Sequence, residues 1–272
     1  MYRSYWQLER RPFENTDDPQ FYYPGESHQG TLLKLRYVVE NQRGGAVLAG
    51  ASGTGKTLLV RTLGRQLAES FRPLVHLVFP QMPAADLLAY LADELAPPAA
   101  DAPRGVDQSI RRIKKFLAEN EARGKHAVLV IDEAHLLQDN ESLEALRLLL
   151  NFEAAGGTAL TLILVGQPKL LPILDRMPGF EERLALKCLL RPLTLEETIS
   201  YVGHRLLAAG AKRPLFEPKA LETLHALTHG LPRRINRLCD LALLIGFAEE
   251  RTIISAEQLE AVTQELVAVT PE

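Results

Sequence analysis

GASGTGKT, the segment from Gly50 to Thr57, is the most informative stretch of this chain. It matches the pattern G-x-x-x-x-G-K-[ST]. The short apolar run at 46–49 precedes it, and leucines with helical spacing follow at positions 59, 63 and 67. Strand, loop and helix therefore occur in the order that this pattern requires. We predict a loop whose backbone N–H groups, together with a helix N-terminus, bind phosphate oxygens.

Individual residues of this phosphate loop have distinct expected roles. Lys56 is expected to reach the β- and γ-phosphates of a nucleoside triphosphate, and the Thr57 hydroxyl to ligate Mg²⁺. The alternative, a glycine-rich turn without a ligand, is disfavoured because the strand, the helix and the Lys-Thr pair are all present. The residues expected to bind the nucleotide are Gly50, Ser52, Gly53, Thr54, Gly55, Lys56 and Thr57.

A second segment, VLVIDEAH at 128–135, is an apolar strand that ends in two carboxylates. Asp132 lies at the carboxyl edge of the predicted sheet, where it is expected to hold Mg²⁺ through the water shell of the ion. Glu133 points to the other side of the chain, where it is expected to polarise an attacking water molecule. The alternative for Glu133 is a solvated acid that caps the next helix. His135 either orients Glu133 or is a packed or solvent-facing histidine.

The strand predicted at 160–165 is followed by Gly166, Gln167 and Pro168. If this strand is the neighbour of the strand at 127–131, the Gln167 amide is expected to lie close to the γ-phosphate. The alternative is an ordinary glutamine in a turn.

Apolar runs alternate with helical patterns in the first two thirds of the chain. Strands are predicted at 46–49, 74–79, 127–131 and 160–165, with helices at 28–39, 87–95, 110–117 and 143–150. Uniformly apolar strands between helices predict a parallel sheet that is covered on both faces. From Thr194 onward only helices are predicted, because Thr194 and Glu197 have capping-box spacing, Pro218 and Pro232 suit helix starts, and Ser255 begins another cap. We therefore predict an α/β nucleotide-binding domain over 1–192, including an N-terminal linker, and a small helical domain over 193–272.

The composition is that of a globular protein, with 46% hydrophobic and 24% charged residues in 272. A net charge of -3 gives no global basic footprint for nucleic acid, although a local basic groove is compatible with it. No stretch has signal-peptide character or approaches about 18 apolar residues, so we expect a cytoplasmic location and no transmembrane segment. Cys188 and Cys239 have no metal-ligand spacing and are expected to be reduced and buried.

Further motifs follow one another along the chain besides the phosphate loop. They are Pro12-Phe13, Asp18-Pro19-Gln20-Phe21, His28, Asp132-Glu133-Ala134-His135, Gly166-Gln167-Pro168-Lys169-Leu170, Pro192-Leu193 with Glu196-Glu197, and Gly230-Leu231-Pro232-Arg233-Arg234-Ile235-Asn236. In this order they resemble the motifs of AAA+ ATPases of the bacterial ExeA/GspA-like group, and the resemblance covers nearly the whole chain. The resemblance implies a phosphate-loop α/β domain with a helical AAA+ lid, with ATP and Mg²⁺ bound between them.

The same resemblance assigns roles to further residues. Gln167 matches the sensor-1 position and Arg233 the sensor-2 arginine, which reaches the γ-phosphate from the lid. A merely structural Arg233 is disfavoured, because a cation in the first turn of a helix opposes the helix dipole. Arg183 is the candidate for an arginine donated to the neighbouring subunit, with Arg176 as its competitor and a surface ion pair as the alternative. Near the N-terminus, Pro12-Phe13 either contacts adenine or serves only packing.

The first functional hypothesis is an AAA+ ATPase that hydrolyses ATP at the subunit interfaces of a homo-oligomer, a ring or a filament, to remodel or recruit a protein partner. The alternative is an ATP-dependent DNA-binding assembly factor resembling transposition regulators of the same superfamily. A helicase is disfavoured because the tail after 192 leaves no room for a second motor domain. A non-hydrolysing nucleotide switch is disfavoured by Glu133, Gln167 and the candidate Arg183. Longer members of the group continue into a membrane segment and a periplasmic module. Because this chain ends at Glu272, we expect a role other than direct envelope secretion.

Overall fold

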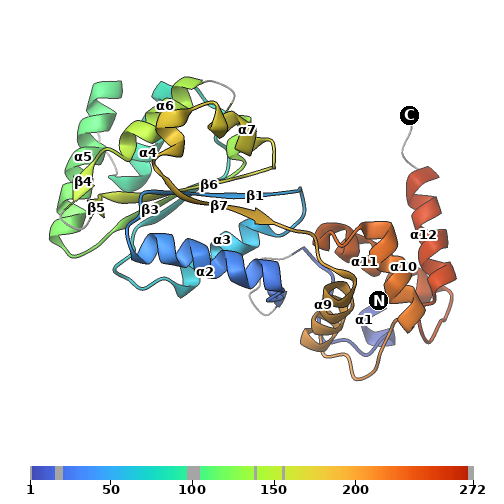
Figure 1. Ribbon diagram of the computed structural model, residues 1–272. Helices are drawn as coiled ribbons and strands as arrows, with labels where there is room; N and C mark the ends of the chain where they lie inside the picture. Colours follow the sequence, from blue (N-terminus) through green and yellow to red (C-terminus); the bar gives the residue numbers. More distant parts are fainter. Residues whose placement is uncertain (1, 16–20, 97–104, 138–139, 155–156, 269–272) are drawn as a thin grey trace. The chain divides into compact units, whose positions relative to one another are not determined.

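The computed structural model describes residues 2–15, 21–96, 105–137, 140–154 and 157–268 (Figure 1). The motif residues Asp18, Pro19 and Gln20 lie outside these ranges. The chain forms two compact units. We call residues 28–51 with 59–190 the sheet unit, and residues 1–27, 52–58 and 191–272 the helical unit.

Five parallel strands form the centre of the sheet unit. They are β1 (Gly45–Gly50), β2 (Leu74–Leu77), β3 (Ala127–Ile131), β6 (Leu160–Gly166) and β7 (Leu184–Leu190), in the order β2-β3-β6-β1-β7. Strands β1, β3 and β6 are buried along their whole length, which explains their uniformly apolar sequences. A small antiparallel pair, β4 (Glu153–Ala154) and β5 (Gly157–Thr158), stands apart from this sheet.

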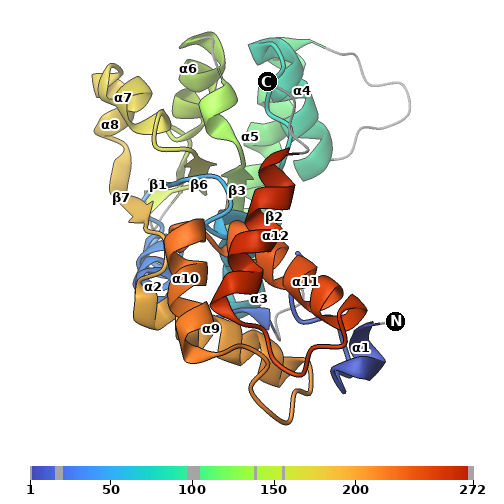
Figure 2. The ribbon, with the colours of Figure 1, turned by 90° about the vertical axis from the view of Figure 1, so that its right-hand side faces the viewer.

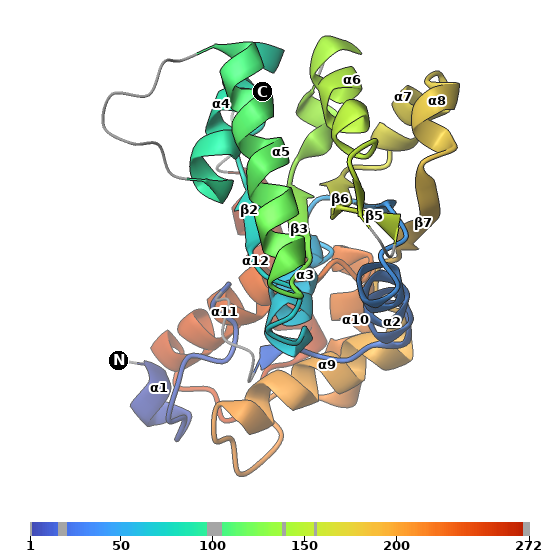
Figure 3. The same cartoon turned by 90° about the vertical axis from the view of Figure 1, so that its left-hand side faces the viewer.

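Helices cover both faces of the sheet (Figures 1 and 3). One face carries α2 (Glu26–Glu40) and α3 (Lys56–Gln66), and the other α4 (Ala84–Leu95), α5 (Val106–Ala122), α6 (Asn140–Leu149) and α7 (Leu170–Asp175). The strand order agrees with this division for the crossover helices. The chain moves one way across the sheet from β1 to β2, with α3 between them, and back from β2 through β3 to β6, with α4, α5 and α6, and crossovers of one hand then place helices on opposite faces. The short α8 (Pro178–Glu181) precedes β7. The predicted parallel sheet with helices on both faces is therefore confirmed.

One predicted strand is shorter than its apolar pattern. The run at 74–79 forms β2 only as far as Leu77, and Val78 and Phe79 are 56% and 67% exposed. The parallel pairing of β2 with β3 also ends at Leu77, opposite Ile131. Without a partner strand, β-branched and aromatic residues do not extend a strand by propensity alone.

The helical unit contains α9 (Leu195–Ala208), α10 (Pro218–Thr228), α11 (Pro232–Ala248) and α12 (Ala256–Ala268), shown from another side in Figure 2. Local sequence signals set their starts. Thr194 and Glu197 form a complete capping box, and α10 and α11 each begin with proline, whose missing N–H costs nothing there. At α12, the Ser255 hydroxyl accepts a hydrogen bond from the Gln258 N–H at 3.4 Å.

The N-terminal segment, which includes α1 (Tyr2–Tyr5), packs within the helical unit. Trp6 is 1% exposed and donates its indole N–H to the Leu243 carbonyl at 2.9 Å. The buried Arg205 guanidinium donates to the Pro12 carbonyl at 2.5 Å, and Phe13 is 2% exposed in the core of this unit. Residues 1–27 therefore group with the final helices, whereas the division of the sequence at 192 stays a prediction.

Both cysteines are buried and free, as predicted. Burial raises the pKa of the Cys188 and Cys239 thiols, which keeps them protonated. Within the described residues, no helix combines the length and the apolar character needed to cross a membrane.

Candidate functional site

The phosphate loop connects β1 to α3. Gly50 is the last residue of β1 and Lys56 the first of α3, so residues 51–55 make the whole turn. Gly53 and Gly55 have φ angles of +83° and +95°, which glycine adopts without the steric cost of a side chain. Thr54 and Lys56 are buried. The predicted strand, glycine loop and helix start are all present, and the partial positive charge at the N-terminus of a helix favours an anion.

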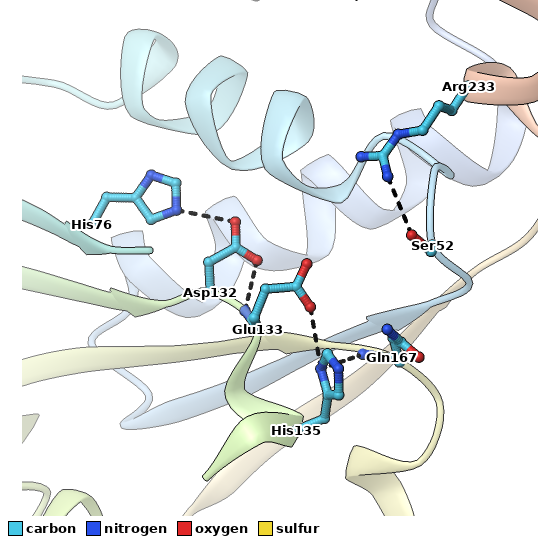
Figure 4. Close-up of polar contacts among 7 residues, drawn as sticks. All are labelled: Ser52, His76, Asp132, Glu133, His135, Gln167 and Arg233. Atoms are coloured by element: carbon cyan, nitrogen blue, oxygen red, sulfur yellow. Dashed lines mark hydrogen bonds and ion pairs between the residues drawn. The ribbon is translucent and has the colours of Figure 1, made fainter. Parts of the chain in front are cut away.

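Arg233 of α11 contacts this loop within the helical unit. Its backbone N–H donates to the Gly53 carbonyl at 3.2 Å, and its guanidinium donates to the Ser52 hydroxyl at 3.3 Å (Figure 4). A Cβ built on Gly53 would lie 2.7 Å from the Arg233 Cβ, closer than side chains tolerate. Gly53 thus meets two demands, a positive φ and a close approach. The contact places a cation beside a loop of the type that binds phosphate.

Asp132 follows β3 directly and is 2% exposed. One carboxylate oxygen accepts the Glu133 N–H at 2.9 Å, and the other lies 3.3 Å from Nε2 of His76 (Figure 4). The Asp132 N–H donates to the Leu77 carbonyl on the neighbouring strand β2 at 2.8 Å. These contacts fix a buried carboxylate at the carboxyl edge of the sheet, where open parallel sheets bind ligands.

Glu133 has a left-handed backbone, with φ 50° and ψ 32°. That conformation costs a non-glycine residue roughly 1–2 kcal/mol and is concentrated at functional sites. Its side chain is 43% exposed, so the carboxylate can reach water. Glu133 precedes a short 3-10 helix, Ala134–Leu136, and its carbonyl accepts the Leu136 N–H at 2.8 Å, but its side chain makes no capping hydrogen bond. The geometry therefore does not support the alternative role of Glu133 as a helix cap.

Strand β6 lies beside β3, which is the arrangement that the expectation for Gln167 required. Gln167 follows the end of β6, and its backbone N–H donates to Nδ1 of His135 at 3.2 Å. The same Nδ1 lies 3.3 Å from a carboxylate oxygen of Glu133, and His135 is 4% exposed (Figure 4). His135 is thus both packed and in contact with Glu133, so the structure combines the two interpretations of this residue.

Arg183 and Arg176 lie on the surface, before β7 and after α7 respectively. Within the described ranges, neither guanidinium makes a hydrogen bond or an ion pair. The interpretation of Arg183 as a partner in a surface ion pair is therefore not supported. Lys187 holds the surrounding segments together, because its ammonium group binds Asp175 and Glu181, each at 2.7 Å.

His76 is a site residue that the sequence did not indicate. It lies on β2, in register with Val130 of β3, and its ring contacts Asp132. Residues 77–131 lie between His76 and Asp132 in the sequence, and no sequence pattern predicts that β2 and β3 are neighbours. Only the strand order identifies this contact.

A phosphate loop after β1, an acidic pair after β3 and a helical unit with an arginine on the loop define a phosphate-loop ATPase fold of the AAA class. The family model for the AAA domain matches residues 39–174, half of the chain. The chain belongs to this family.

General secretion pathway protein A of Aeromonas hydrophila is 38% identical over 251 residues, which are 91% of this chain and 45% of that protein. The chain therefore spans less than half the length of this relative. Solved structures share the fold at much lower identity. Cdc6p of Pyrobaculum aerophilum superposes with a TM-score of 0.73 at 18% identity, over 96% of this chain and 74% of that one. The Thermotoga maritima RuvB branch migration motor gives 0.60 at 17%, over 88% and 69%.

Proposed function

We propose that this chain is a Mg²⁺-dependent ATPase that hydrolyses ATP at the subunit interfaces of a homo-oligomer and so remodels or recruits a protein partner. The contact of Arg233 with the phosphate loop is the observation that carries the proposal. An anion bound by the loop N–H groups gains a second, cationic partner from α11. A charged hydrogen bond of this kind contributes about 1.5–3 kcal/mol.

The residues present fit a triphosphate with a magnesium ion. Positive φ angles at Gly53 and Gly55 let the loop curl, and Lys56 is the cation expected at the β- and γ-phosphates. Thr57 and Asp132 would hold Mg²⁺, because hydroxyl and carboxylate oxygens are the hard donors that it prefers. The bound ion supplies neutralisation of charge on the phosphate oxygens.

The chain then supplies the groups for hydrolysis. Glu133 accepts a proton from a water molecule as its oxygen attacks the γ-phosphorus, and the bond from phosphorus to the β-γ bridging oxygen breaks to release ADP and phosphate. The Gln167 amide and Arg233 bind the γ-phosphate, and the exposure of Glu133 gives it access to water. No covalent intermediate on the protein is needed.

Arg183 completes the site of a neighbouring subunit in this proposal. Its guanidinium is exposed and, among the described residues, forms no ion pair, so it can bind a negative charge on another molecule. A donated arginine stabilises the charge of the transition state and is worth on the order of 10³ in rate. Arg176 remains the competing candidate, because it is exposed in the same way.

The alternative function is ATP-dependent assembly on DNA. Aeropyrum pernix ORC1, whose structure is in complex with DNA, shares the fold with a TM-score of 0.64 at 17% identity, over 88% of this chain and 65% of that one. The net charge of -3 favours the protein-directed function.

The proposal is tested by measuring ATP turnover as a function of protein concentration, with and without duplex DNA. Light scattering reports the mass of the protein assembly in the same samples. We expect the rate per subunit to rise with assembly and to be independent of DNA. Arg183→Ala should lower the rate per subunit of the assembled protein by about 1,000-fold. Arg111→Ala, an exposed arginine on α5, is the matched control and should change nothing. A rate independent of concentration would contradict the role of the interface. Turnover or assembly triggered by DNA would favour the alternative.

A further inference from the structure

One ring nitrogen of His135 faces two different groups. Nδ1 lies 3.2 Å from the backbone nitrogen of Gln167, at the end of β6, and 3.3 Å from Oε2 of Glu133, after β3 (Figure 4). The two contacts come from neighbouring strands of the sheet unit. His135 is therefore the one side chain in Figure 4 that touches both residues.

These two contacts demand opposite states of Nδ1. A ring nitrogen without a proton accepts the Gln167 N–H, and its lone pair then repels the Glu133 carboxylate. A ring nitrogen that carries the proton donates to Glu133 and can no longer accept from Gln167. The contacts are thus alternatives, and moving the ring proton between its two nitrogens exchanges one for the other.

The surroundings hold the ring in place while this exchange occurs. The His135 side chain is 2% exposed. A Cβ built on Gly166 would lie 3.2 Å from the His135 backbone nitrogen and 3.3 Å from Nδ1, so the absence of a side chain at 166 lets β6 approach the ring this closely. Gly166 does not have a positive φ angle, so packing rather than backbone conformation is the reason for glycine at this position.

We propose that His135 is a positioning residue whose Nδ1 alternates between two hydrogen bonds. It accepts from the Gln167 backbone N–H in one state and donates to the Glu133 carboxylate in the other. The inference rests on the proposed function, in which Gln167 meets the γ-phosphate and Glu133 activates water. A shift of the β6 end on nucleotide binding releases Nδ1, which then donates to Glu133 and fixes its carboxylate. Glu133 is thereby aligned for catalysis only when the γ-phosphate has engaged Gln167.

The first test separates positioning from packing with two substitutions of His135. His135→Ala removes the hydrogen bond, and we expect kcat to fall by about 100-fold with the Kd for ATP within about twofold, because misplacing a catalytic group affects the transition state and not ground-state binding. His135→Asn places an amide near the position of Nδ1 that flips to accept or donate, so it should keep kcat within about fivefold of wild type.

The second test changes the neighbour instead of the histidine. Gly166→Ala crowds the ring and should lower kcat by roughly 10-fold, again without a change in the Kd for ATP. Gly30→Ala on α2 is the matched control in the same unit, because a Cβ there meets nothing within 4 Å. It should leave kcat unchanged.

Two results would overturn the inference but not the proposed function. In the first, the wild-type protein hydrolyses ATP and His135→Ala has the same kcat. In the second, His135→Asn is as slow as His135→Ala. The second would mean that only the packing of the ring matters. A wild-type protein that binds ATP without hydrolysing it under any assembly condition would instead overturn the proposed function, and this inference with it. The failure of one is therefore distinguishable from the failure of the other.

Discussion

The carboxylate edge of the sheet unit and the phosphate loop of the helical unit hold their functional groups by different means. At the edge, groups from three neighbouring strands contact each other: the ring of His76 contacts Asp132, and the ring of His135 contacts the backbone N–H of Gln167. At the loop, Arg233 contacts the backbone of Gly53, and the absence of a side chain permits this approach. The edge therefore depends on strand order, whereas the loop depends on one local conformation.

Glu133→Gln, at the carboxylate edge, should have the largest effect of the four substitutions, and it should act on ATP turnover. The amide cannot accept a proton, so turnover should fall by about 1,000-fold while ATP binding is retained. Steady-state phosphate release together with binding of a fluorescent ATP analogue measures the two quantities. Glu141→Gln, at the exposed start of α6, is the control. Normal turnover by the Glu133 variant would show that the edge does not perform catalysis.

Lys56→Ala should produce the opposite pattern at the loop. Loss of its ammonium group removes a charged partner of the phosphates, so the Kd for ATP should rise by at least about 100-fold. Calorimetric titration measures this change, and Lys114→Ala on the exposed side of α5 should bind like wild type. Undiminished affinity in Lys56→Ala would remove the phosphate loop from the binding site.

The stability of the sheet unit should depend on pH through His126. Its ring lies 2.8 Å from the Thr161 hydroxyl, and burial lowers its pKa from 6.5 to about 4. As pH falls, the unfolded chain takes up the proton first, so stability is complete above about pH 7 and is lost between about 6.5 and 4. Between pH 8 and pH 5 the loss should be about 2 kcal/mol. Urea unfolding measures it, and His126→Gln should lose this component.

Gly53→Ala should give the smallest effect of the four and tests the loop as a conformation. A side chain at φ +83° costs roughly 1–2 kcal/mol, and it also displaces Arg233. Thermal unfolding should detect the loss, with about a tenfold weaker affinity for ATP. Gly203→Ala on α9 has space for a Cβ and should stabilise the helix slightly. Equal behaviour of the two variants would mean that the close approach at Gly53 is unimportant.

Much of the fold could be predicted because its signals are local. The Thr194 capping box, the prolines that begin α10 and α11, and the uniformly apolar strands each act over a few residues. The phosphate loop is local too, since strand, glycines and helix follow one another directly. Even so, the apolar pattern placed the end of β2 two residues too late, because the pairing with β3 stops at Leu77.

The sequence by itself determined the chemistry available: a loop for phosphate, two carboxylates after a buried strand, and an arginine at the start of a late helix. Only the tertiary structure decided which of these groups meet. His76 reaches Asp132, and His135 contacts the backbone of Gln167, because β3 lies between β2 and β6. The described residues before Ser27, with Trp6 and Phe13 among them, likewise pack with the last helices. The physical reason is that strand order and packing arise from burial shared by distant segments, which no short window of sequence records.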